Sequence, residues 1–298
     1  MMLSYYLSLG GILVFAFLNR KRRNSNKIKE KVTSDGVLDS LSDAGLVRDN
    51  NEDSVTTVVH PNNKNLKLLA VADGVGGCED GEVASNFAIM TLQKWFTNLS
   101  EDTINNSKHM SKSVTEIIRF INNYLYIVKS YNNSCGTTLT CAIVNKKETI
   151  IASIGDSRAY IVKNNEIEQV TRDDSLVWYY YEAGELDKDE IRFHRENCLI
   201  TQYVGPELDI EPEVIKINND SYDGLLLFTD GVTDCISDSK IERIVNKSSK
   251  NNLAKAIIKE AVYGKPPKRI PKGEKFRAPI NGKDNASVAI YLKETRYV

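Results

Sequence analysis

The chain is poor in the residues on which disulfide and soft-metal chemistry depend. Its 298 residues include only three histidines and five cysteines. The cysteines are Cys78, Cys135, Cys141, Cys198 and Cys235. No two of them have the CxxC spacing that is typical of zinc sites and thiol redox motifs. Cysteines scattered in this way indicate reduced thiols in a cytosolic setting.

The chain also lacks an excess of charge of either sign. Its 39 Lys and Arg residues nearly balance 40 Asp and Glu residues, which gives a net charge of -1. This balance gives no reason to expect a nucleic acid partner. With 41% hydrophobic and 27% charged residues, the chain can bury one large core. We therefore expect one folded domain over residues 41–298, acting as a monomer.

A hydrophobic run stands near the start of the chain. Leu3 to Leu18 is uncharged and mostly apolar, and the basic cluster Arg20 to Arg23 follows it at once. The run is slightly short of the ~20 residues that span a bilayer, although flanking residues can extend it. A secretory signal would place its positive charges before the run. The pattern predicts a single-pass membrane anchor over residues 1–23, a polar tether over 24–40 and a cytoplasmic domain. A cleaved or wrongly assigned start is the alternative, and it leaves a cytoplasmic protein.

Strand-like runs dominate the middle of the chain. They include LKLLAVAD, TTLTCAIV, TIIASIG, RAYIV, GLLLFTD and ASVAIYL. Amphipathic helices fit Ala84 to Phe96, Ser113 to Lys129 and Ile241 to Tyr263. Short strands joined by tight turns, with longer helices between some of them, predict layered sheets covered by helices.

Four aspartates stand at the ends of such runs, namely Asp73, Asp156, Asp230 and Asp284. A carboxylate at a strand end is held by a rigid sheet and cannot withdraw into the core. Several of them converging on one cleft repel each other unless cations lie between them. Since carboxylate and carbonyl oxygens suit Mg²⁺ or Mn²⁺ better than zinc or copper, the sequence predicts a hard-metal site.

Further short motifs accompany these aspartates in a fixed order. They read RxxxED, DGxGGxxxGExAS, CGTT, GDSRAY, TxDxS, HxxN, LLLxTDGxTD and DNAS. From about Ser42 to Leu292 this order resembles the metal-dependent protein phosphatase 2C family, in its compact bacterial form of serine/threonine phosphatases. The resemblance implies an α+β fold, a four-layer α-β-β-α sandwich. Two packed antiparallel β-sheets would be flanked by helices, with the metal site at one end.

The resemblance also implies roles for individual residues. The ligands of two Mn²⁺ or Mg²⁺ ions would be the carboxylates of Asp53, Asp73, Asp230 and Asp284 and the carbonyl of Gly74. Asp156 and Asp234 match positions that hold a third, weaker ion together with Asp230. Glu52 would hold water at the metals, and Arg48 would grip the substrate phosphate.

The chemistry of such a site is phosphomonoester hydrolysis. Two divalent ions roughly 3.5 to 4 Å apart can share a hydroxide and present it in line with the leaving oxygen, so no covalent intermediate is needed. The planar fork of Arg48 can hold two phosphate oxygens. No cysteine is followed six positions later by arginine, which argues against a cysteine-nucleophile phosphatase.

The partners implied are proteins phosphorylated on serine or threonine, and a serine/threonine kinase whose action the chain reverses. A pseudophosphatase that binds phosphoproteins without turnover is the alternative function. The intact set of carboxylates counts against it, because a binding-only protein has no need of them.

Four residues depart from the family pattern. Val75 stands where animal and plant relatives often have a histidine proposed as the acid, and bacterial relatives usually a methionine. We therefore expect water at the metals to protonate the leaving oxygen. Cys78 and Asp174 each replace a histidine of the family motifs, and Arg195 replaces a proline. None of these changes removes a predicted metal ligand.

Several residues keep a second interpretation. Arg48 could be an ordinary solvated charge, and Asp234 could instead cap a helix that begins near Ser237. Arg158 fits a structural role better than a catalytic one. His60 and His194 fit surface or hydrogen-bonding roles better than metal ligation.

Two segments are expected to lie outside the regular layers. Residues 175–205 correspond to the variable flap beside the metal site and are expected to contact substrate, although Trp178 could instead belong to the buried face of a helix. Gly264 to Gly282 is rich in Pro, Gly, Lys and Arg and predicts a long loop. Its charges either meet an acidic phosphoprotein or are simply solvated, and the second reading is favoured.

Overall fold

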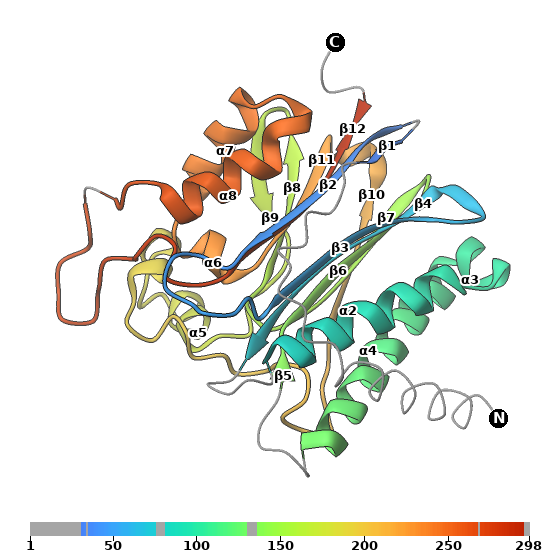
Figure 1. The fold of residues 1–298 in the computed structure, drawn as a ribbon, viewed down its shortest axis with the longest axis horizontal. Helices are drawn as coiled ribbons and strands as arrows, with labels where there is room; N and C mark the ends of the chain where they lie inside the picture. The colour runs from blue at the N-terminus through green and yellow to red at the C-terminus, as the bar shows by residue number, and fades with distance from the viewer. Residues whose placement is uncertain (1–30, 34, 76–80, 130–135, 268, 295–298) are drawn as a thin grey trace.

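The computed structural model describes residues 31–33, 35–75, 81–129, 136–267 and 269–294 (Figure 1). The predicted anchor over residues 1–23 lies outside these ranges, as do residues 24–30 and 34 of the tether and Cys78. The prediction that the tether continues to residue 40 was wrong, because Lys31–Thr33 and Gly36–Asp43 form β-strands of the folded domain. Within them, no helix combines the length and the apolar composition needed to cross a membrane.

Two β-sheets form the centre of the molecule (Figure 1). Sheet A has the order β1 (Lys31–Thr33), β2 (Gly36–Asp43), β12 (Ala286–Lys293), β11 (Gly224–Phe228), β8 (Arg158–Lys163) and β9 (Glu166–Gln169). Sheet B has the order β10 (Glu213–Asn218), β7 (Glu148–Ile154), β6 (Leu139–Val144), β4 (Asn63–Val75) and β3 (Asp53–His60), and β5 (Gly136–Thr137) pairs with β4. Every strand pair in both sheets is antiparallel, as predicted.

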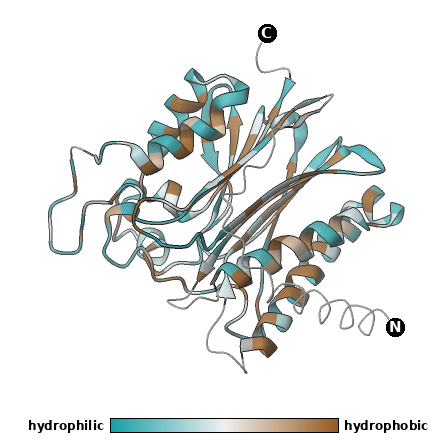
Figure 2. Ribbon diagram, in the orientation of Figure 1, coloured by the Kyte–Doolittle hydropathy of each residue, from teal (hydrophilic) through white to brown (hydrophobic). Residues whose placement is uncertain are grey.

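The central strands, such as β4, β6, β11 and β12, are apolar on both faces because they are buried on both sides (Figure 2). In β4, Leu68 and Ala70 pack toward the helices that cover sheet B, while Leu69 and Val71 pack into the core between the sheets. A strand covered on both faces reads as a nearly continuous hydrophobic run rather than as an alternating pattern. This explains why such runs located the strands in the sequence.

Helices cover the outer face of each sheet, which completes the predicted four-layer α-β-β-α sandwich (Figure 1). Helices α2 (Gly81–Thr97) and α4 (Ser107–Lys129) lie on sheet B, with the short α3 (Glu101–Asn105) between them. Helices α7 (Asp238–Lys247) and α8 (Leu253–Tyr263) lie on sheet A.

The prediction of a single helix from Ile241 to Tyr263 was wrong. Helix α7 ends at Lys247, Ser248 has an extended backbone, and a 3₁₀ turn, η3 (Lys250–Asn252), precedes α8. The segment between the helices is rich in Ser and Asn, whose side chains compete for backbone hydrogen bonds and disfavour a helix interior. The apolar pattern is interrupted at the same place, since no apolar residue stands between Val245 and Leu253.

The remaining elements lie near the sheet ends. The flap contains α5 (Leu176–Glu182) and the 3₁₀ helix η1 (Lys188–Phe193); η2 (Asn219–Ser221) precedes β11, and α6 (Asp230–Thr233) follows it. The described part of 264–282 has neither helix nor strand, which confirms the predicted loop. This loop pairs with the flap, because His194 forms an isolated bridge with Phe276 and the Arg277 amide donates to the Phe193 carbonyl over 2.7 Å.

Candidate metal centre

Asp53 and Asp73 come from neighbouring strands of sheet B and stand side by side. Asp53 is the first residue of β3, and it lies directly opposite Asp73 in the antiparallel register of β3 and β4. Residues directly opposite in such a pair project from the same face, with Cβ atoms about 5 Å apart. The register therefore sets the two carboxyl groups against each other.

Thr229 joins Asp53 to the other sheet. Its hydroxyl donates to Asp53 Oδ2 over 2.8 Å and accepts from the Ser287 amide over 2.9 Å. Thr229 is fully buried and follows the last residue of β11, while Ser287 lies in β12. One hydroxyl thus fixes an aspartate of sheet B against two strands of sheet A, at the end where the site forms.

The backbone of Asp73 is held by two threonines beside β5. The Thr138 amide and the Thr137 hydroxyl both donate to the Asp73 carbonyl over 2.8 Å, and the Asp73 amide donates to the Thr138 hydroxyl over 2.9 Å. The same Thr138 hydroxyl lies 2.8 Å from that of Ser157. The threonines of the CGTT motif therefore connect Asp73 to the turn that carries Asp156.

That turn depends on Gly155, which has a φ of +104°. A side chain at this position would be strained, and its Cβ would also lie 2.7 Å from Thr138 side-chain atoms. Asp174 caps the turn, because its carboxylate accepts from the Gly155 amide and its own amide donates to the Gly155 carbonyl, both over 2.9 Å. Asp174, where the family pattern has histidine, thus supports the loop that places Asp156.

Asp230 and Asp234 both come from the short helix α6. Asp230 is its first residue, and the Asp234 amide donates to the Asp230 carbonyl over 2.8 Å. The Asp234 carboxylate accepts a hydrogen bond from the side-chain amide of Asn197 in the flap. Ser237 is the N-cap residue of α7, and Asp234 is the C-cap residue of α6. The alternative role for Asp234, as the cap of α7, is therefore wrong.

Asp284 reaches the site from the loop before β12. Its carboxylate accepts from Arg48 over 2.9 Å and from the Asn285 amide over 3.0 Å. Nearly half of the Arg48 side chain is exposed, so the guanidinium stands at the rim of the site. Burial and the charges of Asp284 and Glu82 raise the pKa of Glu52, while the Arg48 charge lowers it.

Asn285 secures the loop that carries Arg48 and Glu52. Its side-chain oxygen accepts from the Glu52 amide over 2.8 Å, and its side-chain nitrogen donates to the carbonyls of Ala44 and Asn50 over 2.9 and 3.0 Å. The side-chain amide of Asn285 thus provides hydrogen-bond partners for three backbone groups of one loop. This fixes the loop against the start of β12.

Glu52 and Gly74 meet the start of α2. The Gly74 amide donates to the Glu52 carbonyl over 3.2 Å, and the Ser85 hydroxyl donates to the same carbonyl over 2.5 Å. A Cβ on Gly74 would collide with the carbonyl oxygens of Gly81 and Glu52. Glycine is therefore required at position 74 by this close approach of three backbone segments.

Burial and mutual repulsion raise the pKa values of Asp53 and Asp230. Burial, with the charges of Asp230 and Asp284, raises the pKa of Asp53 to about 8, although hydrogen bonds from Ser287 and Thr229 lower it. Burial and the charge of Asp284 raise the pKa of Asp230 to about 6.

Asp73, Asp156 and Asp234 show the same effect. Burial first, and then the charges of Asp53 and Asp230, raise the pKa of Asp73 well above its ordinary value. The pKa values of Asp156 and Asp234 are also raised well above that value, by burial and then by the Asp230 charge. Each of these pKa values is raised in part by the charge of another aspartate. The structure therefore brings all six predicted aspartates together.

Two oxygens of this cluster are buried without a hydrogen-bond partner among the described residues, namely Asp53 Oδ1 and Asp230 Oδ1. A buried polar atom without a partner is costly, and here both are carboxylate oxygens in an acidic cluster. Such hard oxygen donors fit a divalent cation such as Mn²⁺ or Mg²⁺. No group of three His, Cys, Asp or Glu side chains in the described ranges is already arranged as a metal shell. Arg48 and Asn197 instead occupy oxygens of Asp284 and Asp234.

The structure decides several of the alternative interpretations. Arg158 is buried and ion-paired with Asp173, its nitrogens lying 2.7 to 3.0 Å from the carboxylate, which confirms the structural role. His60 and His194 are buried and accept hydrogen bonds from the backbone amides of Asn62 and Glu196. The hydrogen-bonding interpretation is therefore confirmed for both histidines, whereas the surface interpretation is wrong.

The flap has a core of its own. Trp178 is 8% exposed and packs with Val177, Leu186 and Ile191, so it belongs to the buried face of α5. Tyr179, in contrast, is exposed and stacks on Arg172.

Sequence reasoning missed three supporting residues, namely Thr229, Asn285 and Asn197. Each stands inside a recognised motif, LLLxTDGxTD, DNAS or HxxN, but received no role. A signal was available, since a side-chain amide or hydroxyl beside a carboxylate can orient it. Their partners are distant in sequence, however, so only the fold reveals them.

Comparison with known proteins agrees with the fold. The sequence model of the family described as protein phosphatase 2C matches residues 47–261. The serine/threonine phosphatase stp of Listeria welshimeri is 33% identical over 229 residues, which cover 75% of this chain and 89% of that protein.

Solved structures extend the likeness to three dimensions. The serine/threonine phosphatase Stp1 from Staphylococcus aureus superposes with a TM-score of 0.73 and 27% identity, covering 92% of this chain and 98% of that one. The catalytic domain of the phosphatase PstP, in complex with two manganese ions, has a TM-score of 0.69 and 25% identity, covering 86% and 97%. Together with the family match over most of the chain, these similarities identify the protein. The chain belongs to the protein phosphatase 2C family and is a serine/threonine phosphatase of the bacterial type.

Proposed function

We propose that this chain hydrolyses phosphoserine and phosphothreonine in proteins, using water activated by two divalent cations. The observation that carries the proposal is the cluster of six aspartates, in which Asp53 Oδ1 and Asp230 Oδ1 are buried without a partner among the described residues. Carboxylates crowded in this way repel one another, and divalent cations bound between them would remove that repulsion.

The residues that would hold the two cations are Asp53, Asp73, Asp230 and Asp284, together with the carbonyl of Gly74. When bound, Mn²⁺ or Mg²⁺ supplies a nucleophilic hydroxide at neutral pH and neutralises charge on the phosphoryl group. The two manganese ions of the PstP catalytic domain support the stoichiometry. Asp156 and Asp234 would hold a third, weaker ion with Asp230.

Arg48 binds the substrate phosphate in this proposal. Its guanidinium is exposed at the rim and pairs with Asp284, so a phosphate can approach it from solvent. A planar, always charged fork can hold two phosphate oxygens at once and offset the negative charge of the transition state. Val75 has no proton to give, so water at the site protonates the leaving oxygen.

Glu52 acts as an acceptor that orients water at the centre. Its backbone is fixed by Asn285 and Ser85, which limits where its carboxylate can reach. A phosphoprotein-binding pseudophosphatase is not favoured, because a protein that only binds phosphate gains nothing from a repulsive cluster of buried carboxylates.

The cellular setting is also proposed from sequence. The apolar run and the basic cluster within residues 1–23 support a single-pass anchor that holds the domain on the cytoplasmic side of a membrane. There a monomeric enzyme would oppose a serine/threonine kinase acting on the same phosphoproteins.

The experiment is phosphate release by the purified chain from phosphothreonine and phosphotyrosine peptides of the same sequence, with Mn²⁺ and with EDTA. We expect release that requires Mn²⁺ and favours phosphothreonine. Arg48→Ala should raise KM strongly, while Arg119→Ala, at an exposed arginine of α4, should leave KM unchanged. No release from the folded protein, across several phosphopeptides and metals, would favour the pseudophosphatase.

A further inference from the structure

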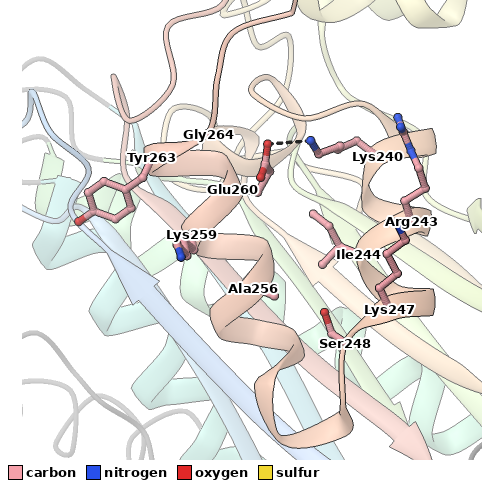
Figure 3. A pocket seen from close by; sticks show the side chains of 10 residues that line it. All are labelled: Lys240, Arg243, Ile244, Lys247, Ser248, Ala256, Lys259, Glu260, Tyr263 and Gly264. Carbon is pink, nitrogen blue, oxygen red and sulfur yellow. Dashed lines mark ion pairs between the residues drawn. The ribbon is translucent and has the colours of Figure 1, made fainter.

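Helices α7 and α8 enclose an open pocket of about 400 Å³ on the outer face of sheet A (Figure 3). Three small residues, Ser248, Ala256 and Gly264, contribute to its lining. Because their side chains are short or absent, they leave space that larger side chains would fill. Neither the proposed metal ligands nor Arg48 and Glu52 line this pocket.

The pocket is basic, although the chain as a whole is nearly neutral. Its lining includes four basic side chains and one acidic side chain. The acidic one, Glu260, is already paired with Lys240, whose Nζ lies 2.9 Å from the Glu260 carboxylate (Figure 3). Arg243, Lys247 and Lys259 are exposed, and none of them forms an ion pair with another described residue.

The pocket also offers apolar surface between these charges. Ile244 lies on α7 and points toward α8, while Ala256 lines the α8 side (Figure 3). Tyr263, at the end of α8, is 59% exposed. Unpaired positive charges around apolar surface match a ligand that carries both carboxylates and an apolar side chain.

We propose that this pocket docks a short acidic segment of a protein partner, in which carboxylates flank an apolar residue. The carboxylates would pair with Arg243, Lys247 and Lys259, and the apolar side chain would lie against Ile244 between the two helices. The concave shape and the apolar lining favour a peptide segment over the flat surface of an anionic membrane. Docking here is independent of the hydrolysis proposed above, because the two sites share none of the residues named.

The test measures binding of a fluorescein-labelled peptide, with three glutamates on either side of a leucine, to the full chain by fluorescence anisotropy. The pocket variant is R243E with K247E. The matched control, K94E with K108E, changes net charge equally at exposed lysines of α2 and α4. Circular dichroism verifies that both variants fold, and a peptide with glutamine in place of glutamate checks the role of charge.

We expect the pocket variant to bind the acidic peptide about tenfold more weakly or worse, while the control variant binds as the unmodified chain does. Binding should weaken as salt is raised, and the glutamine peptide should not bind. Equal loss in both variants, or no binding to the unmodified chain, would overturn the proposal. So would binding of the unmodified chain, but not the pocket variant, to phosphatidylserine vesicles alone, since this would identify the basic surface as a lipid contact. Phosphate release from a small substrate serves as a separate readout that the pocket variant should leave unchanged.

Discussion

Asp53 shows how the negative charge of a buried carboxylate is neutralised when no cation is bound. It is 7% exposed, Thr229 satisfies one of its carboxylate oxygens, and the other has no partner among the described residues. Moving a carboxylate into such surroundings is unfavourable unless the group is neutralised. A proton does this in the metal-free protein, and a divalent cation can take its place.

We therefore expect the metal-free chain to lose stability as pH rises from about 4 to about 8. Burial and neighbouring charges raise the pKa of Asp53 from 3.8 to about 8 in the folded state. Between these values the folded state keeps a proton that the unfolded state has released, so raising the pH favours unfolding. One such group contributes at most about 1.4 kcal/mol per pH unit.

Urea unfolding in EDTA at pH 5 and pH 8 measures this effect. Mn²⁺ should restore more stability at pH 8 than at pH 5, because at the higher pH it competes with fewer protons. Stability that rises with pH in EDTA would contradict the balance inferred for Asp53.

Thr229, whose hydroxyl donates to the Asp53 carboxylate, provides a second test of how that carboxylate is held. Thr229→Val keeps the side-chain shape but leaves the Ser287 amide and Asp53 Oδ2 without their shared hydroxyl. Leaving a buried donor or acceptor unsatisfied costs about 1 to 3 kcal/mol of unfolding free energy. Thr229→Ser keeps the hydroxyl and should cost less than Thr229→Val. Chemical denaturation in EDTA compares the two variants, and a valine variant as stable as the unmodified chain would refute the role of this hydroxyl.

Among the elements, the turn from β7 to β8 shows how a loop is fixed to place a carboxylate. Gly155 takes a backbone conformation that side chains disfavour, and Thr138 lies against it. Its amide and carbonyl are both hydrogen-bonded to Asp174. The turn therefore presents Asp156 to the site from a rigid base.

Gly155→Ala should destabilise the chain more than Gly184→Ala. Both glycines have positive φ, +104° and +75°, so both alanines meet backbone strain of about 1 to 2 kcal/mol. Only the Cβ at position 155 would collide with Thr138, while position 184 has no atom within 4 Å. Overpacking adds roughly 1 to 3 kcal/mol at position 155. Thermal unfolding and phosphate release measure the difference, and equal effects of the two alanines would show that the fit against Thr138 is unimportant.

The elements also show where sequence reasoning succeeds and fails. Strands such as β4 and β11 were predictable because burial on both faces gives continuous apolar runs. The break between α7 and α8 was missed, although residues 246–252 (NKSSKNN) contain no apolar side chain and could have marked it. The contact between the flap and residues 275–277 was also missed, because it joins segments about eighty residues apart in sequence.

At the scale of the whole molecule, the two sheets are joined by an ion pair as well as by their apolar core. Lys67 of β4 is fully buried, and its Nζ lies 2.6 Å from the Asp35 carboxylate, which stands just before β2. The Tyr291 ring of β12 lies 5.1 Å from the same Nζ. A buried charge on sheet B is thus paired with residues in and beside sheet A.

Asp35→Ala should destabilise the molecule far more than Lys67→Met. The Asp35 side chain is 40% exposed, but removing it leaves the buried ammonium of Lys67 without its charged hydrogen-bond partner, which costs about 1.5 to 3 kcal/mol. Replacing Lys67 with an apolar residue of similar length removes the charge as well and should be nearly neutral. Urea unfolding of both variants compares them, and similar losses in the two would contradict this account.

The aspartates of the site were predictable from sequence, but the polar residues that hold them in place were not. All six predicted aspartates meet, because strand ends in antiparallel sheets gather at one edge of the sandwich. The polar side chains that hold these aspartates and their loops, Thr229, Asn285 and Asn197, bind partners that lie 37 to 241 residues away in sequence. Spacing along the chain carries no signal for such contacts.

The most direct test of the metal centre is the number of Mn²⁺ ions bound per chain at pH 7.5, measured by isothermal titration calorimetry on the metal-free protein. We predict two tightly bound ions besides the weaker third, proton release on binding, and loss of at least one tightly bound ion in Asp230→Asn while the variant stays folded. Absence of Mn²⁺ binding to the folded chain, or unchanged binding by Asp230→Asn, would contradict the conclusion that these aspartates form a metal centre.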